Sequence, residues 1–358
     1  MLIRMRGRVR AGLRGWGGVG AMAAVCALVL GFACALLLPL AQSRADGSPG
    51  TGGPGLTRAD QTADDKPCDN PAIKAHPEEQ TLSPSSADGT TIDKIKAREG
   101  AKRKLIVGVD QNSYRWGYRN PNSGPKADLE GFDIDLVHRI AQDILGDPKA
   151  VQFKAIPTNQ RIPAIQKGRV DMVVRTMTIN CKRLADVAFS APYFKTGQQV
   201  LAPKSSDIKG YDGTLAHKKI CTAEGSTAFS QLDEDKRAGK LVASADLRTT
   251  VPNQLDCLVR LQLGEVDAVV TDGALAASQA AQDPTVELKG SPFTTEYYGV
   301  AMKSDADDLV RRVNQVLVDY RKDTTDGWQA SYDRWLSATL DKSSAKSEPP
   351  PPKYLRKN

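Results

Sequence analysis

Residues 161–190 of this 358-residue chain read RIPAIQKGRVDMVVRTMTINCKRLADVAFS, and the stretch changes structural type several times. Its opening arginine begins a segment of helical character, and the apolar residues 170–174 that follow are typical of a strand. The strand ends in a Thr-x-Thr turn formed by Thr176 and Thr178, and Arg183 follows the turn. Hydroxyls, turn N–H groups and an arginine fork are the groups that hold a carboxylate. The stretch therefore predicts an anion site where a strand ends.

Strand-like and helix-like segments alternate on both sides of this stretch. Apolar runs typical of strands lie at 105–109, 151–156, 200–202, 219–221, 268–270 and 298–302. Segments with helical spacing of apolar residues lie at 91–99, 132–145, 161–167, 228–237, 249–263, 275–281 and 306–322. This alternation predicts an α/β fold with mostly parallel sheets, and the length fits two units of ordinary domain size.

The formal net charge of +7 lies at the two ends of the chain. Arginines dominate the first 18 residues, and lysines dominate residues 341–358, whereas the part between them is close to neutral. The predicted folded region thus has no basic surface of the kind that binds DNA or RNA, and we expect no nucleic-acid partner.

Residues 19–41 form an apolar stretch without a charged residue, and the basic residues 1–18 precede it. The positive-inside rule predicts that residues 1–18 stay in the cytoplasm and that the rest is exported. The stretch is long enough for a retained membrane anchor. Small residues near Ser43 and Ala45 also fit a cleaved signal peptide, and Cys34 is an alternative site for a lipid anchor. All three alternatives predict an extracytoplasmic protein, either attached to the membrane or secreted.

Two segments flank the predicted folded region. Residues 45–90 are rich in Gly, Pro, Ser, Thr and Asp, a composition that predicts a tether. Residues 341–358 include four consecutive prolines and predict an extended, disordered tail.

Four of the six cysteines fall in the region predicted to be exported: Cys68, Cys181, Cys221 and Cys257. An oxidising compartment favours two disulfides, for which three pairings exist, and four buried free thiols are the alternative. Neither these cysteines nor the three histidines have the spacing of a metal site, so we expect no metal and no cofactor.

Four motifs together carry a resemblance to a known family: LIVGVDQNS (105–113), GFDIDLVHRIA (131–141), NQRIPAIQKGRVDMVV (159–174) and TMTINCKRLADVAFSAPYF (176–194). In this order they resemble family 3 extracytoplasmic solute-binding proteins of polar amino-acid ABC importers. The resemblance spans residues 104–340, and within the family it is strongest to glutamate/aspartate-binding proteins of actinobacteria, which share the four-cysteine pattern.

The resemblance implies a type II periplasmic-binding-protein fold with two lobes and a hinge of two strands. Residues 91–195 and 292–340 would form lobe 1, and residues 200–291 would form lobe 2. Because Cys221 and Cys257 would both lie in lobe 2, the implied disulfides are Cys221–Cys257 and Cys68–Cys181.

The resemblance also implies roles for individual residues. Arg183 would bind the α-carboxylate of the ligand, with Thr176 and Thr178 adding hydroxyl and N–H donors. Asp272 would receive the α-ammonium. From lobe 2, the turn containing Ser226 and Thr227 would touch the ligand. The alternatives are structural: a surface ion pair for the arginine, strand-end capping for the first two threonines, and helix capping for the lobe 2 residues.

Arg161 decides the predicted ligand class, because the matching arginine in glutamate/aspartate-binding proteins reaches the side-chain carboxylate. A second buried arginine without a counter-anion would be costly, which favours a dicarboxylic ligand; the alternative is an exposed arginine at a helix start. Asp110 and Arg175 are further cleft candidates, with the acid pairing either Arg161 or Arg175.

The predicted function is therefore capture of glutamate or aspartate for the membrane permease of an ABC importer. A second hypothesis keeps the binding but reports to a signalling membrane protein. A third is a dehydratase-like enzyme on the same fold, for which Glu224 is the only candidate acid and no His–Asp pair is in place, so we expect no enzyme. A fourth is a structural protein with an empty cleft.

Overall fold

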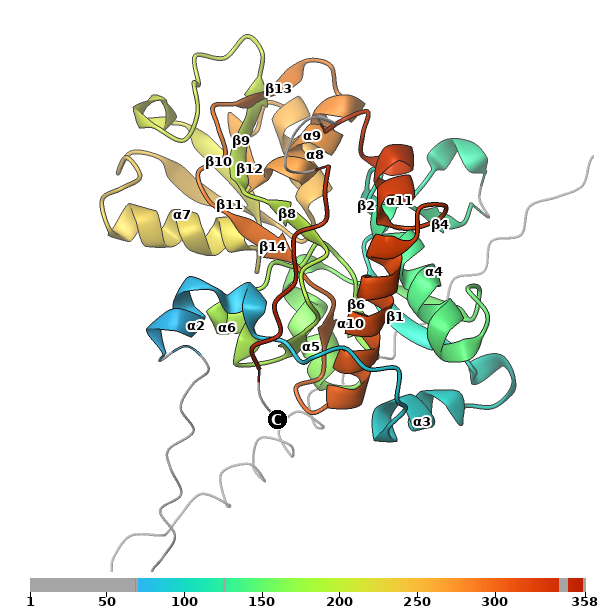
Figure 1. The fold of residues 1–358 in the computed structure, drawn as a ribbon. Helices are drawn as coiled ribbons and strands as arrows, with labels where there is room; N and C mark the ends of the chain where they lie inside the picture. The colour runs from blue at the N-terminus through green and yellow to red at the C-terminus, as the bar shows by residue number, and fades with distance from the viewer. Residues whose placement is uncertain (1–67, 69, 125–126, 341–346, 357–358) are drawn as a thin grey trace, which may run out of the picture. The chain divides into compact units, whose positions relative to one another are not determined.

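The computed structural model describes residues 68, 70–124, 127–340 and 347–356 (Figure 1). The basic residues 1–18 and the apolar stretch 19–41 lie outside these described residues. Among the helices that are described, none combines the length and the apolar character needed to span a bilayer.

The first of two five-stranded sheets has the order β5-β1-β6-β15-β7. In it, β1 (Leu105–Val109) is parallel to β5 (Val151–Ala155) and β6 (Met172–Val173), whereas β15 (Ala301–Met302) is antiparallel to β6 and β7 (Ala188–Phe189). We call this sheet and the elements around it lobe 1. Its helices are α3 (Thr90–Lys96), α4 (Phe132–Leu145), α5 (Arg161–Gln166), α6 (Cys181–Leu184), α10 (Asp307–Lys322) and α11 (Trp328–Trp335).

The second sheet, with the order β11-β10-β12-β9-β13, defines lobe 2. Here β10 (Lys219–Ala223) is parallel to β11 (Asp246–Val251) and β12 (Ala268–Asp272), and β9 (Gln198–Pro203) is antiparallel to β12 and β13 (Val286–Lys289). The helices of lobe 2 are α7 (Thr227–Arg237), α8 (Gln254–Gln262) and α9 (Gly273–Gln282).

Two antiparallel strands, β8 (Phe194–Thr196) and β14 (Glu296–Tyr298), connect the lobes (Figure 1). Gly197 follows β8, and a Cβ there would lie 2.0 Å from the carbonyl oxygen of Thr294, so only glycine allows the two crossings to approach this closely. The predicted two-lobed α/β fold with a two-strand hinge is confirmed.

The expectation of mostly parallel sheets is only partly correct, because both sheets are mixed. The chain enters lobe 2 through β8 and β9 and returns through β13 and β14. The strands nearest these crossings therefore run against their neighbours.

Lobe 1 has the larger apolar core, which α4 illustrates. Its buried apolar residues recur at helical spacing, as the sequence predicted: Phe132, Ile134, Leu136, Val137, Ile140 and Ile144. A cluster of aromatic rings packs beside the start of α4 and extends to the hinge: Trp116, Phe194, Tyr298 and Trp328. This cluster fixes the hinge strands against lobe 1. A small three-stranded sheet of β2 (Asn112–Ser113), β3 (Gly117–Arg119) and β4 (Leu129–Glu130) lies next to α4.

The predicted helix over residues 249–263 is wrong in its first part. The β-branched residues Thr249, Thr250 and Val251 extend β11, and Pro252 follows them. Helix α8 begins only after Asn253, which forms a capping box with Asp256.

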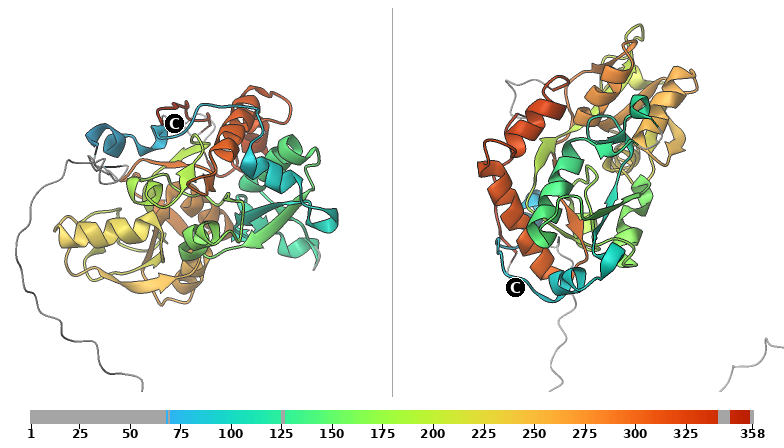
Figure 2. Two further views of the ribbon diagram at one scale, coloured as in Figure 1. Left: turned by 90° about the horizontal axis from the view of Figure 1, so that it is seen from below. Right: turned by 90° about the vertical axis from the view of Figure 1, so that its right-hand side faces the viewer.

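The predicted tether and tail also need correction, since parts of both pack against lobe 1. The Thr81 hydroxyl donates to the Phe189 carbonyl oxygen at 2.7 Å, and Leu82 is fully buried. The C-terminal segment lies beside this stretch, where the Leu355 N–H donates to the carbonyl oxygen of Glu79 (Figure 2). Composition alone indicated unfolded segments, whereas backbone pairing and one buried leucine hold the described parts of both in place.

Two disulfides join cysteines of the described residues. One joins Cys221 in β10 to Cys257 in α8, with 5.6 Å between their Cα atoms. The other joins Cys68, which precedes α2 (Pro71–Ala75), to Cys181 at the start of α6. The second bond ties the N-terminal segment to the helix that carries Arg183.

Candidate ligand-binding site

A cavity of about 190 Å³ lies between lobe 1 and lobe 2. Lobe 1 contributes Arg161 from α5 and Arg183 from α6, and lobe 2 contributes Gly225, Ser226 and Thr227 at the start of α7. The structure therefore brings together two arginines and a helix N-terminus, groups that attract anions.

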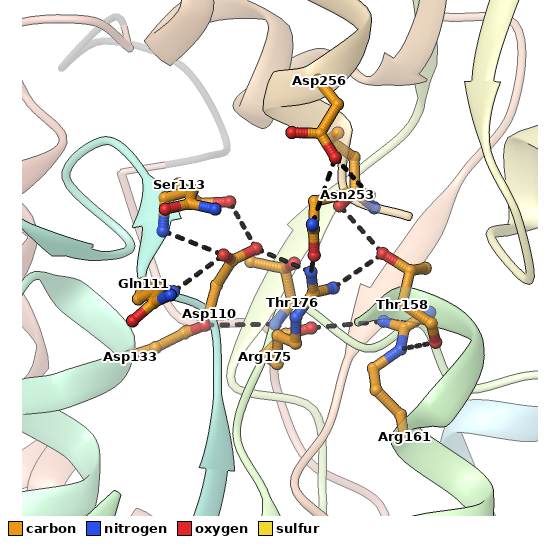
Figure 3. Close-up of polar contacts among 12 residues, drawn as sticks. Asp110, Gln111, Ser113, Asp133, Thr158, Arg161, Arg175, Thr176, Asn253 and Asp256 are labelled. Atoms are coloured by element: carbon orange, nitrogen blue, oxygen red, sulfur yellow. Dashed lines mark hydrogen bonds and ion pairs between the residues drawn. The ribbon is translucent and has the colours of Figure 1, made fainter. Parts of the chain in front are cut away.

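Arg161 is only 3% exposed, and its guanidinium donates hydrogen bonds to three backbone carbonyl oxygens. Its Nε donates to Thr158 O at 2.9 Å, and one terminal nitrogen donates to Arg175 O at 3.3 Å (Figure 3). The other terminal nitrogen donates to Gly225 O at 3.4 Å. Within the described part of the chain, no carboxylate forms an ion pair with this guanidinium. Burial, followed by the charges of Arg183 and Arg175, lowers the pKa of Arg161 well below its ordinary value. The site therefore contains a buried cation that lacks a counter-anion.

Arg183 is also buried and uses the same carbonyl. One terminal nitrogen donates to Thr178 O at 2.6 Å, and the other donates to Gly225 O at 3.2 Å. Asn180 caps α6 and accepts from the Arg183 N–H, which fixes where the side chain starts. Burial lowers the pKa of Arg183, while the carboxylates of Glu296 and Asp272 act in the opposite direction.

The turn at Gly225 brings the lobes into contact. Its φ of 74° lies in the left-handed region, and a Cβ there would lie 2.8 Å from the Cα of Asn159. Thr158 donates its N–H to Pro252 O at 3.0 Å, again from lobe 1 to lobe 2. Glu224, the acid considered for an enzyme, is exposed and accepts from the Asn159 amide at 3.0 Å. The structure thus shows the lobes closed on each other.

Ser226 and Thr227 differ in their contacts. The Ser226 hydroxyl caps α7 by accepting from the Phe229 N–H at 3.0 Å, which is the structural alternative considered for it. The Thr227 hydroxyl instead donates to Glu296 at 3.0 Å and accepts from the Gln198 amide at 2.9 Å. Thr227 therefore connects the start of α7 to the hinge strand β14 and to the first residue of β9.

Asp272 ends β12 and precedes α9, but its side chain does not cap that helix. Its carboxylate accepts from the Gln198 amide and the Tyr298 hydroxyl, each at 2.5 Å. Burial, and then the nearby charge of Glu296, raise the pKa of Asp272 to about 8.

Glu296 is a member of the site that the sequence did not predict. It is 7% exposed, and its carboxylate accepts from the Thr178 hydroxyl at 2.6 Å as well as from Thr227 and Gln198. It lines a second cavity, of about 670 Å³, which shares Thr227 with the first. Gln198 falls between the two predicted lobes and Glu296 in the second predicted segment of lobe 1, and no motif marked either residue.

Asp110 and Arg175 form an ion pair of 2.8 Å behind the cavity, and neither residue lines it. The remaining lone pairs of Asp110 accept from the N–H groups of Gln111 and Asn112 and from the Ser113 hydroxyl. Arg175 is fully buried and also donates to the Thr158 hydroxyl and to Asn253, at the start of α8 (Figure 3). Of the two pairings considered for the acid, the structure shows the one with Arg175.

Thr176 adopts a positive φ of 41°, and its N–H donates to Asp133 at 3.1 Å. Asp133 also accepts from the Tyr193 hydroxyl at 2.8 Å, and burial raises its pKa to about 7. These contacts hold the turn that leads to Thr178. In the described structure, the Thr176 N–H, which was predicted to donate to the ligand, instead donates to the carboxylate of Asp133.

Comparison with known proteins assigns the chain to a family. The model of the "Bacterial extracellular solute-binding proteins, family 3" matches residues 105–338. The chain belongs to this family. As a family 3 protein it is a solute-binding protein and not an enzyme, as the sequence predicted.

Similar family 3 proteins differ in the ligand that they are named for. The ABC transporter glutamine-binding protein GlnH of Bacillus subtilis is 35% identical over 65% of this chain and 81% of the relative. The glutamate-binding protein GluB of Corynebacterium glutamicum is 29% identical over 59% of this chain and 72% of the relative. The expected stronger likeness to glutamate-binding proteins of actinobacteria is thus not seen in these identities.

Solved structures with the same two-lobed fold include a P235GK mutant of ArgBP from T. maritima. It has a TM-score of 0.61 and 26% identity, and the match covers 69% of this chain and all of that chain. An ancestral arginine-binding protein bound to glutamine has a TM-score of 0.56 and 32% identity, over 65% of this chain and 97% of that chain. These likenesses confirm the type II periplasmic-binding-protein fold.

Proposed function

We propose that this protein binds an acidic amino acid, glutamate or aspartate, between its lobes and delivers it to the permease of an ABC importer. Family membership and the glutamine- and glutamate-binding relatives support the coarser function, binding of a polar amino acid for such an importer. The observation that carries the acidic ligand is the buried guanidinium of Arg161, which lacks a counter-anion among the described residues.

The two arginines suit two carboxylates. Arg183 would bind the α-carboxylate, because its fork projects from α6 beside Thr178 and faces the N-terminus of α7. Arg161 would bind the side-chain carboxylate from the same cavity. The Gly225 carbonyl, which now accepts from both guanidinium groups, is a weaker partner than an ionised oxygen. A dicarboxylate would therefore replace two hydrogen bonds to a neutral carbonyl oxygen with bonds to ionised oxygens.

An amide side chain fits this arrangement less well. The amide oxygen of glutamine could accept from Arg161, but its NH₂ group needs an acceptor of its own. Asp110 already accepts three hydrogen bonds and pairs with Arg175. A buried, unpaired NH₂ group costs free energy, so the geometry favours the acid over the amide. A cationic ligand such as arginine would place a third positive charge near Arg161 and Arg183, which disfavours it.

The ligand can be identified without assuming its class. The protein purified from its natural host would be denatured, and the released small molecules would be identified by mass spectrometry. Recovery of glutamate or aspartate in near-stoichiometric amount supports the proposal. Recovery of glutamine or arginine would overturn the acidic assignment while leaving amino-acid binding intact.

Transport and sensing require the same binding site and differ in the partner. The transport proposal predicts that cells lacking this protein lose high-affinity uptake of labelled glutamate or aspartate. Normal uptake together with an altered transcriptional response to these amino acids would support a signalling membrane protein as the partner instead.

A further inference from the structure

Two carboxylates meet at the hinge end of the site through one amide. The Gln198 Nε2 nitrogen lies 2.5 Å from Asp272 Oδ1 and 2.9 Å from Glu296 Oε1. Gln198 is fully buried, and both acids are at least nine-tenths buried. The group therefore joins lobe 2, which supplies Asp272 from β12 and Gln198 from β9, to the hinge strand β14, which supplies Glu296.

This group has too few hydrogen-bond donors. The Gln198 Nε2 carries two hydrogens but has three oxygens within range, the third being Thr227 Oγ1 at 2.9 Å. Ionised carboxylates only accept hydrogen bonds. Among the described residues, the buried Gln198 Oε1 also has no donor. The cluster is thus built to receive an additional N–H or O–H donor.

The charges that face the cluster define its titration. Burial raises the pKa of Asp272 to about 8, and Glu296 is the second cause. Tyr298 donates its hydroxyl to Asp272, and the cations of Arg183 and Arg161 lie on the lobe 1 side. The nearby carboxylate of Glu296 thus favours the protonated form of Asp272.

Glu296 also links the lobes. Its Oε2 oxygen accepts from Thr178, in lobe 1, at 2.6 Å and from Thr227, in lobe 2, at 3.0 Å. A charge change at Asp272, which Gln198 connects to Glu296, therefore acts on the contacts that hold the closed form together.

We propose that Glu296 and Asp272, bridged by Gln198, form a two-carboxylate receptor in which the proton on Asp272 is exchanged for the α-ammonium of the ligand. The ammonium supplies three N–H donors and a positive charge, and the displaced proton leaves to solvent, so that charge balances. The inference rests on the proposed function only in requiring a ligand with an α-amino group. It makes Glu296 a ligand-binding residue and makes affinity depend on pH.

Calorimetric titrations at pH 7 in buffers of different ionisation enthalpy count the protons released on binding. We expect the wild-type protein to release close to one proton per ligand, about the fraction that Asp272 holds at this pH. Glu296→Gln removes the second charge, so we expect proton release to fall below about half and glutamate affinity to fall about tenfold. Glu287→Gln, at a partly exposed residue paired with Lys289, is the matched control and should behave as wild type.

Two results would overturn the inference: binding by the wild-type protein without proton release, or equal release by Glu296→Gln. If Glu296→Gln does not fold, the proton release measured for the wild-type protein still tests the inference. Glutarate, which has both carboxylates of glutamate but no ammonium, should bind without releasing a proton. If glutamine binds instead of glutamate, the proposed ligand is wrong but the proton count with glutamine still tests this inference.

Discussion

Arg161 and Arg183 donate hydrogen bonds to one and the same oxygen, the carbonyl of Gly225, at 3.4 and 3.2 Å. The two guanidinium groups come from α5 and α6 of lobe 1, whereas the shared acceptor lies in lobe 2. Neither arginine forms an ion pair within the described residues. Two buried cations thus converge on a neutral acceptor, which defines the place and the charge of the proposed ligand.

Arg183→Lys should weaken the binding of every amino-acid ligand by about a hundredfold. A lysine keeps the charge but loses the planar fork that binds a carboxylate through two hydrogen bonds. Isothermal titration calorimetry measures the loss, and Arg237→Lys, at an exposed position of α7, should leave affinity unchanged. An affinity within threefold of wild type in Arg183→Lys would exclude the assigned role.

Asp110→Asn should lower the free energy of unfolding by about 3–5 kcal/mol, because it leaves the fully buried Arg175 without its charge partner. Urea denaturation measures the change. Asp233→Asn, which breaks an exposed pair with Arg237, should cost less than about 1 kcal/mol. Adding Arg175→Met to Asp110→Asn should recover part of the loss. Similar values for the two single variants would contradict the structural role of the buried pair.

Asp133 should make stability depend on pH. Its pKa is about 7 in the folded protein and 3.8 in its ordinary state, so the folded form holds the proton more tightly. The protonated Asp133 carboxyl therefore contributes its full stabilisation below about pH 4, and this stabilisation is lost as the pH rises through 7. Asp133→Asn should flatten the unfolding free energy between these pH values relative to wild type. An unchanged pH profile in urea titrations would argue against protonation of Asp133.

Loss of the Cys221–Cys257 disulfide should destabilise the protein by about 4 kcal/mol, since the bond closes a loop with a sequence separation of 36. The double variant Cys221→Ser with Cys257→Ser tests this in urea, with Ser230→Ala in α7 as a control for substitution within lobe 2. A change below 1 kcal/mol would mean that the bond constrains the unfolded chain little.

Local sequence patterns predicted much of the fold, because the periodic spacing of apolar residues in a helix or strand can be read within a short segment. The helix over 132–145 and the strand over 105–109 match α4 and β1 residue for residue. The Thr-x-Thr turn and the arginine after it are also local, and the structure places Arg183 beside the cavity together with Arg161.

Features that depend on distant partners were not predictable in this way. Glu296 acquires its environment from Thr178, Thr227 and Gln198, which are separated from it by 118, 69 and 98 positions. The segment ending at Arg356 reads as a proline-rich tail, and its backbone pairing with the carbonyl oxygens of Glu79 and Thr81 reveals where it packs. Both depend on tertiary contacts that leave no periodic signal.

The most direct test of the central claim compares glutamate with glutamine by calorimetry, in ligand-free wild-type protein and in Arg161→Gln. We predict that wild type binds glutamate more tightly, and that Arg161→Gln loses at least about tenfold for glutamate but less than about threefold for glutamine, because only the acid brings a second charge. Arg169→Gln, at an exposed position after α5, is the matched control. A wild-type preference for glutamine, or equal losses for both ligands in Arg161→Gln, would contradict the account.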